Sequence, residues 1–272
     1  MRGWGLLIGT AAWLLMVSEA AAQQACYTKR GEEAIAACTH DIESLPTARG
    51  RAVAYNNRGD AYRATGRSDL AIADFDQAII LDPNYAHAYY NRGNAYGDDK
   101  GDLSRAIADF SETIRLNPNL VAAYFNRARA YLYSGDSAKA LADMDHAAGL
   151  APKDAYNALW LDIIGQRNDA SGRLSQSVSN FDMTAWPAPV VQLFLSRLSL
   201  ADVLAAADNA DAVKKKSQVC EAHFYGGELA LRKTESRDEA ILQLRSAATD
   251  CPPDFTEAFA AKAELKALGI AP

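Results

Sequence analysis

The sequence predicts an all-α fold, an α-solenoid built from stacked helical hairpins. Residues recur at intervals of 34 and 35 positions, as at Tyr55, Tyr89 and Tyr124. Each interval contains two small residues at fixed places and ends at a proline, which disfavours helix at the residue before it. A hairpin of this length buries its apolar face only by stacking on its neighbours, so the recurrence predicts a solenoid.

The composition suits a folded protein that does not bind nucleic acid. The chain has 272 residues, 49% of them hydrophobic, and its 34 acidic and 28 basic side chains give a net charge of -6. This apolar share is typical of globular proteins and excludes a disordered chain. Phosphate binding requires clustered Lys and Arg, and the chain has one such run at residues 214–216, so we expect no nucleic-acid partner.

Residues 1–22 have the pattern of a secretory signal peptide. Arg2 precedes an apolar stretch over residues 6–17, and Ala20, Ala21 and Ala22 are the small residues that a signal peptidase requires. The stretch is too short to cross a bilayer, and no later segment reaches the roughly 18 apolar residues of a transmembrane helix. We therefore expect cleavage after Ala22, no stable membrane insertion, and a secreted or periplasmic location.

Export changes the expected chemistry of the four cysteines. In an oxidising compartment two disulfides are favoured, and four cysteines allow three pairings. We favour Cys26 with Cys38, which closes a short loop, and Cys220 with Cys251, which joins two ends that meet in an antiparallel hairpin. The other pairings remain open. A metal site is disfavoured because the chain has no CxxC motif and its histidines lack ligand spacing.

The next element, residues 23–51, predicts an N-terminal cap of half a repeat. The stretch "GEEAIAACTHDI" repeats the pattern of a second helix, with Ala34 and Cys38 at the positions that Ala71 and Phe75 take in the first full unit. A Cys26 to Cys38 disulfide would staple this cap, which has no preceding unit to pack on.

Three full units follow over residues 52–154. Small residues at two places let the paired helices approach closely, and a large apolar residue fills the space between them. The small residues are Gly59, Gly93 and Ala128, then Ala71, Ala106 and Ala140; the large ones are Phe75, Phe110 and Met144; the closing prolines are Pro83, Pro118 and Pro152. We expect Ser68 and Asp136 to cap second helices, and the second unit's extra residue to lie in a turn at residues 97–101.

These units resemble the tetratricopeptide repeat. The matching segments are "AYNNRGDAYRATGRSDLAIADFDQAIILDP", "AYYNRGNAYGDDKGDLSRAIADFSETIRLNP" and "AYFNRARAYLYSGDSAKALADMDHAAGLAP". The resemblance implies a right-handed superhelix whose concave groove is lined by the first helix of each unit. It also implies that a protein or peptide partner binds in that groove.

The strict period is lost over residues 155–216, where we expect an irregular helical region. Ser199 and Asp202 there form the pattern of a capping box. Over residues 217–272 a repeat-like hairpin returns, with Ala240, Leu244 and Ala247 at the repeat's offsets, and a last helix covers the end. Gly226 and Gly227 are interpreted as a helix-packing position rather than a phosphate-binding loop.

The C-terminal half adds a second resemblance. The order of "ALWLDIIGQ", "FYGGELALRKTESRDEAILQLRSAA" and "EAFAAKAELKALG" is similar to that in NlpI-type bacterial lipoproteins. Those are periplasmic tetratricopeptide proteins that act as adaptors for a tail-specific protease and cell-wall hydrolases, so the resemblance implies an adaptor role. Cys26 follows Gln23, Gln24 and Ala25 and lacks the context for lipid attachment, so we expect no lipid anchor.

The groove can be predicted from position in the repeat. Its residues are Val53, Asn56, Asp60 and Arg63 in the first unit, His87, Tyr90 and Asn94 in the second, and Ala122, Phe125, Arg129 and Leu132 in the third. Aromatic faces among amide and charged groups suit a peptide, and Arg63 and Arg129 could hold a carboxylate by forked hydrogen bonds. For Phe125 and Leu132, packing against the next unit is the alternative. The family's lysine and asparagine clamp is not matched at Asn56 and Asp60.

No sequence motif indicates an enzyme or a cofactor. The chain has no GxSxG, GxxxxGK[ST] or HExxH motif. Asp98, Asp99 and Asp102 are interpreted as a solvated turn. Two further hypotheses are kept: a small-ligand-binding protein or enzyme with a pocket between residues 155–216 and the repeats, lined by Trp160 and Trp186, and a homodimer that pairs through the exposed end of the solenoid.

Overall fold

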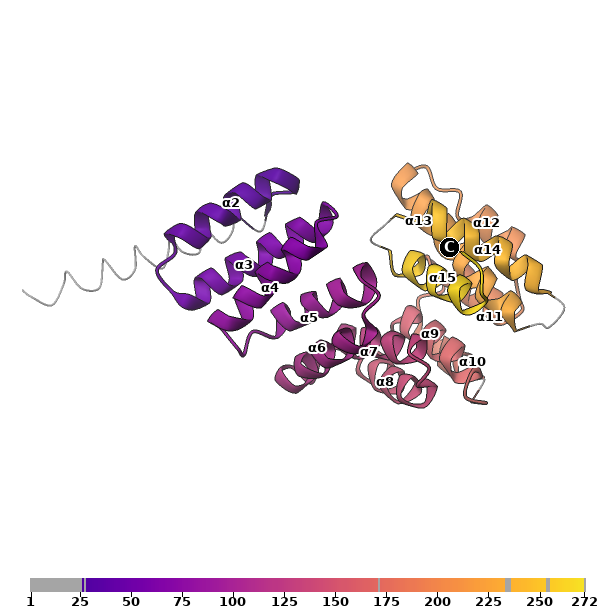
Figure 1. Cartoon of the computed structure of the whole chain (residues 1–272). Coiled ribbons are helices and arrows are strands. Elements are labelled where there is room, and N and C mark those ends of the chain that lie inside the picture. Colours follow the sequence, from indigo (N-terminus) through magenta and orange to yellow (C-terminus); the bar gives the residue numbers. More distant parts are fainter. Residues whose placement is uncertain (1–25, 27, 171, 233–235, 253–254, 272) are drawn as a thin grey trace, which may run out of the picture. The chain divides into compact units, whose positions relative to one another are not determined.

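The computed structural model describes residues 26, 28–170, 172–232, 236–252 and 255–271. These residues form helices joined by short turns, with no strand among them, which confirms the predicted all-α solenoid of hairpins. The predicted signal peptide lies outside the described residues. The chain divides into two compact units, residues 1–130 and 131–272, and each is described by itself (Figure 1).

The first unit is a series of helices, and those over residues 31–116 pack on their neighbours in the chain. They are α2 (Gly31–Ser44), α3 (Ala48–Ala64), α4 (Ser68–Leu81), α5 (Ala86–Asn94), the π-helix η1 (Ala95–Asp99), α6 (Leu103–Leu116) and α7 (Val121–Tyr133), in which the unit ends. Helix α3 packs against α4, and α5 packs against α6. The pairs α3–α4 and α5–α6 are the first two predicted hairpins.

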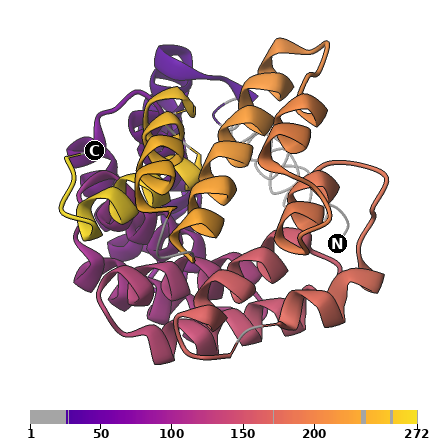
Figure 2. The same cartoon turned by 90° about the vertical axis from the view of Figure 1, so that its right-hand side faces the viewer.

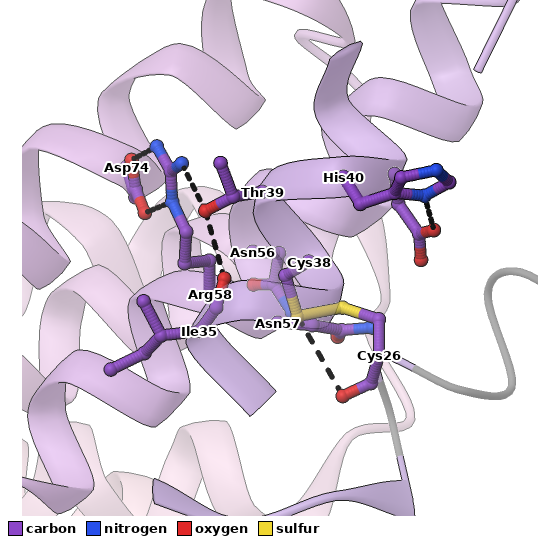
Figure 3. Close-up of a disulfide and its surroundings, with 10 residues drawn as sticks. Cys26, Ile35, Cys38, Thr39, His40, Asn56, Asn57, Arg58 and Asp74 are labelled. Carbon is purple, nitrogen blue, oxygen red and sulfur yellow. Dashed lines mark hydrogen bonds and ion pairs between the residues drawn. A yellow bond between two sulfur atoms is a disulfide. The ribbon is translucent and has the colours of Figure 1, made fainter. Parts of the chain in front are cut away.

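Helix α2 occupies the place of the predicted N-terminal cap. Ala34 and Ile35 of α2 pack against Ala61 of α3, with Tyr62 beside them. The disulfide between Cys26 and Cys38 ties the preceding chain to α2, as Figure 3 shows. Both cysteines are buried.

Close approach of the paired helices depends on two glycines. A Cβ atom added to Gly59 would lie 2.6 Å from Cε1 of Phe75, and one added to Gly93 would lie 2.8 Å from Cε1 of Phe110. Both rings are buried. The predicted pairing of a small residue with a large one therefore holds in both hairpins of this unit.

The extra residue of the second repeat is absorbed inside a helix. From Tyr62 to Gly66 the chain advances four residues, whereas from Tyr96 to Gly101 it advances five. Residues 95–99 form the π-helix η1, the geometry that inserts one residue into an α-helix. The predicted turn at residues 97–101 therefore begins later than expected, and Asp98 and Asp99 are still helical.

The predicted helix caps divide into one success and one error. Asp136 caps α8 (Ser137–Leu150), where its side chain accepts a hydrogen bond from the backbone N–H of Lys139. Ser68 does not cap α4; its hydroxyl instead donates to Oδ2 of Asp99 at 2.9 Å. The sequence pattern missed this contact because Asp99 is 31 residues away.

The second unit begins with helical elements that carry no strict repeat. After α8 come α9 (Ala155–Gln166), α10 (Arg173–Ser177), the 3-10 helix η2 (Val178–Asn180), α11 (Ala188–Phe194) and α12 (Leu200–Ala206). The capping box of Ser199 and Asp202 is present at the start of α12.

The unit ends in α13 (Ala212–Leu231), α14 (Arg237–Asp250) and α15 (Thr256–Ala267). Helix α13 packs against both later helices, and these segments run from orange to yellow in Figure 2. The disulfide between Cys220 and Cys251 joins α13 to the end of α14, with 5.0 Å between the Cα atoms. A Cβ on Gly227 would lie 2.8 Å from Cγ of Leu244, in agreement with a helix-packing role.

Candidate partner-binding face

The predicted groove residues lie on three helices, and we call the surface that they share with their bonded neighbours the first-helix face. They are Val53, Asn56, Asp60 and Arg63 on α3, His87, Tyr90 and Asn94 on α5, and Ala122, Phe125, Arg129 and Leu132 on α7. Asp60 and His87 are exposed, and Val53, Arg63, Tyr90 and Phe125 are half-buried. Leu132 is buried, which favours the packing alternative over a partner contact at this position.

Asparagine side chains link successive first helices. The Nδ2 group of Asn91 donates to Oδ1 of Asn56 at 3.0 Å and to Oδ2 of Asp60 at 3.1 Å. One repeat later, Nδ2 of Asn126 donates to Oδ1 of Asn94 at 2.8 Å and to the hydroxyl of Tyr90 at 3.1 Å.

The predicted residues Asn56 and Asn94 are therefore bonded inside the protein. They are 4% and 9% exposed, which leaves little of either side chain for a partner. Their bonds instead hold one first helix against the next. Sequence reasoning missed Asn91 and Asn126, although both occupy the same repeat position, 35 residues apart.

The two predicted carboxylate-binding arginines already hold carboxylates of the protein. Arg63 donates from Nε to Oδ2 of Asp99 at 3.1 Å and pairs with Oδ2 of Asp98 at 3.4 Å. Arg129 reaches Oδ1 of Asp98 at 3.4 Å, and Nη1 of Arg129 donates to Oδ1 of Asn126 at 3.3 Å. Asp98 thus bridges an arginine of the first repeat and one of the third.

This arrangement corrects the interpretation of Asp98 and Asp99 as a solvated turn. Their side chains are 21% and 15% exposed. The π-helix keeps both residues in helical conformation at the C-terminal end of the first helix, from which they reach the two arginines.

Asp60 is the exposed carboxylate of the first-helix face. Desolvation by the surrounding protein raises the pKa of Asp60 to about 6, against the opposing effects of Arg63 and of the hydrogen bond from Asn91. Among the described residues none forms an ion pair with Asp60.

Each of these hairpins also contains a bidentate ion pair that sequence reasoning missed. Arg58 donates from Nε and Nη2 to the two oxygens of Asp74 at 2.7 and 2.8 Å, and Figure 3 shows the two groups facing each other. Arg92 binds Asp109 in the same way at 2.8 and 2.7 Å. The signal was available, because both pairs recur with the repeat.

The family comparison agrees with the repeats found in the sequence. A model described as TPR repeat matches residues 59–98, and two models described as tetratricopeptide repeat match residues 86–120 and 110–142. Residues 59–142 belong to the tetratricopeptide-repeat family. The matched TPR segment lies inside the predicted span of residues 52–154 and contains α4, α5, η1, α6 and α7 in full.

Solved structures show the same TPR fold. MamA from Desulfovibrio magneticus RS-1 is 19% identical, with a TM-score of 0.51, and the match covers 68% of this chain and 97% of that one. A MamA RS-1 double mutant gives 19% identity and a TM-score of 0.52, covering 61% of this chain and 91% of the other. These likenesses extend the TPR-like fold beyond the segment that the family models match.

The predicted small-ligand pocket near Trp160 and Trp186 is not supported at Trp160. That ring is 1% exposed and stacks on Phe224 with 5.5 Å between centroids. Trp186 is half-buried, and its Nε1 donates to Oε2 of Glu221 at 2.7 Å, beside the hydroxyl of Tyr156 at 2.8 Å. Burial raises the pKa of Glu221 to about 7.

The described residues contain neither a cluster of metal-binding side chains nor a helix suited to crossing a membrane. Within them, no set of three or more His, Cys, Asp or Glu side chains is arranged to hold a metal ion. None of the described helices combines the length and apolarity that a membrane crossing requires.

Proposed function

We propose that this chain is an exported TPR scaffold that binds a protein or peptide partner on its first-helix face. The observation that carries the proposal is the pair of asparagine links from Asn91 and Asn126. Because these links fix neighbouring helices against each other, the face is ordered before a partner arrives, which lowers the entropic cost of binding.

The exposed groups of the face suit a polypeptide. His87 and Asp60 offer polar contacts, and Val53 and the ring of Tyr90 offer apolar area between them along consecutive helices. Such a combination of polar and apolar groups on one surface suits an extended or helical peptide. No sequence motif points to a nucleophile and base on this face, so we propose a binding role and not an enzyme.

Export is supported by the cysteine chemistry. Two disulfides, Cys26 with Cys38 and Cys220 with Cys251, persist in oxidising compartments and are rare in the cytosol. Together with the predicted signal peptide they favour a secreted or periplasmic protein. The adaptor role for a protease or cell-wall hydrolase depends on the NlpI-type resemblance and stays a prediction.

Site-specific photo-crosslinking tests the proposal. A benzophenone amino acid at His87, which is exposed on α5, should capture a partner from a cell-envelope extract. The same group at Ile80, which is 68% exposed on α4, is the matched control and should not. The captured protein is then purified and titrated against wild type, His87→Ala and Ile80→Ala.

The titration decides the outcome. We expect His87→Ala to weaken binding about threefold to fivefold, with Ile80→Ala unchanged, because truncating an exposed interface contact typically costs about 1 kcal/mol or less. Equal crosslinking at both positions, or equal affinities for both variants, would place the partner elsewhere on the chain.

A further inference from the structure

The first inference concerns which charges of the first-helix face are open to a partner. The side chains of Arg63 and Arg129 are both engaged by Asp98, and Arg63 also by Asp99, at 3.1 to 3.4 Å. A ligand carboxylate would have to displace carboxylates that belong to the chain itself. The exchange would replace one ion pair by another while leaving a partly buried aspartate unpaired, which is costly.

The remaining charge on the face is negative. Two arginines stand against three aspartates, Asp60, Asp98 and Asp99, and of these three Asp60 is the exposed one. Its Oδ2 accepts a hydrogen bond from Asn91 at 3.1 Å, and no described residue donates to Oδ1. Asn91 is itself bonded to Asn56, so the Asp60 carboxylate is held in place with one oxygen available.

We propose that the first-helix face takes a peptide segment whose Lys or Arg side chain pairs with Asp60, and that Asp98 and Asp99 are internal counter-ions that exclude acidic segments. This deepens the proposed function and rests on it. The partner class is therefore a basic polypeptide segment, the opposite of the acidic ligand that Arg63 and Arg129 suggest when the sequence is considered alone.

Selection of peptides from a random library tests the proposal. The full mature chain is used to select from a displayed dodecapeptide library, and the charge of the selected peptides is compared with that of the unselected pool. Asp60→Asn removes the proposed pairing group. Asp98→Asn with Asp99→Asn removes the counter-ions. Asp69→Asn, an exposed aspartate on α4, makes the same charge change off the face.

We expect wild type and Asp69→Asn to select Lys-rich or Arg-rich peptides and Asp60→Asn to lose that preference. The Asp98→Asn, Asp99→Asn variant should shift the selection toward acidic peptides. For one selected peptide, a Lys→Gln change should weaken binding to wild type about threefold to fivefold and leave Asp60→Asn unaffected, as for an accessible ion pair.

Each failure has a separate meaning. Peptides selected without a basic preference, or a basic preference that survives Asp60→Asn, would overturn this inference and leave the binding role intact. No selection by any folded variant would overturn the proposed function. If the double variant fails to fold by circular dichroism, the Asp60→Asn and Asp69→Asn comparison still decides the matter.

Discussion

Replacing Gly59 by alanine should destabilise the first unit. The added Cβ would lie 2.6, 2.9 and 3.0 Å from three carbons of the Phe75 ring, closer than real Cβ contacts allow. Phe75 is fully buried and its ring is rigid, so the neighbouring helices must move apart. We take about 3 kcal/mol for this overpacking, offset by about 1 kcal/mol from alanine's higher helix propensity, which leaves a net loss of about 2 kcal/mol.

Urea unfolding, followed by both circular dichroism and tryptophan fluorescence, measures this loss of stability and shows which unit has lost it. Both described tryptophans, Trp160 and Trp186, lie in the second unit, so fluorescence reports on that unit and circular dichroism on the whole chain. The dichroism transition should move to lower urea in Gly59→Ala.

Gly149→Ala is the control, since nothing lies within 4 Å of its added Cβ. This variant should gain up to about 1 kcal/mol. The sequence also suggests a rescue, because the third repeat pairs Ala128 with Met144 at the two equivalent positions. Gly59→Ala combined with Phe75→Met should recover part of the loss. If Gly59→Ala alone is as stable as wild type, the close-packing argument is wrong.

Three other predictions concern buried charge and covalent links. Burial raises the pKa of Glu221 from 4.5 to about 7, so the stability that this group contributes is complete below its unfolded pKa and is lost as pH rises through the folded pKa. Between about pH 5 and about pH 8 the free energy of unfolding, obtained from thermal melts, should therefore fall by on the order of 3 kcal/mol more in wild type than in Glu221→Gln. Parallel pH profiles for the two proteins would contradict this. Replacing Cys220 and Cys251 by serine should cost about 3.7 kcal/mol in urea unfolding, from the entropy of a loop with a sequence separation of 31, unless the pair is not bonded. Arg92→Met should cost about 3 to 5 kcal/mol because it leaves the carboxylate of Asp109 buried without its partner. Arg115→Met, at a pair on the surface, should leave the urea midpoint nearly unchanged, and equal losses for the two variants would rule out the burial argument.

The hairpins, the cap and the disulfide pairs follow from the sequence because each depends on spacing along one chain. The glycine and phenylalanine positions that recur with the repeat, as at Gly59 and Phe75, specify a close helix pair from their spacing alone. The π-helix does not follow in the same way, since a five-residue interval between Tyr96 and Gly101 can be absorbed on either side of a turn. The structure places the extra residue within the helix, before the turn.

The sequence predicts which residues lie on first helices, and it does not predict the hydrogen bonds and ion pairs that their side chains form. The repeat placed Asp60, His87 and Tyr90 correctly on first helices. It could not show that Asn91 reaches back to Asn56, because that bond depends on the register between two helices. It assigned Arg63 to a ligand for the same reason, since the aspartates that bind it lie 35 and 36 residues away.

The π-helix has an evolutionary consequence. A single codon inserted before Gly101 leaves the spacing of the hairpins intact, because the helix takes up the added residue locally. The added residue widens one turn of that helix, in the stretch that carries Asp98 and Asp99. One inserted residue can thus change which charges stand at the end of a first helix while the packed hairpin beneath them stays the same.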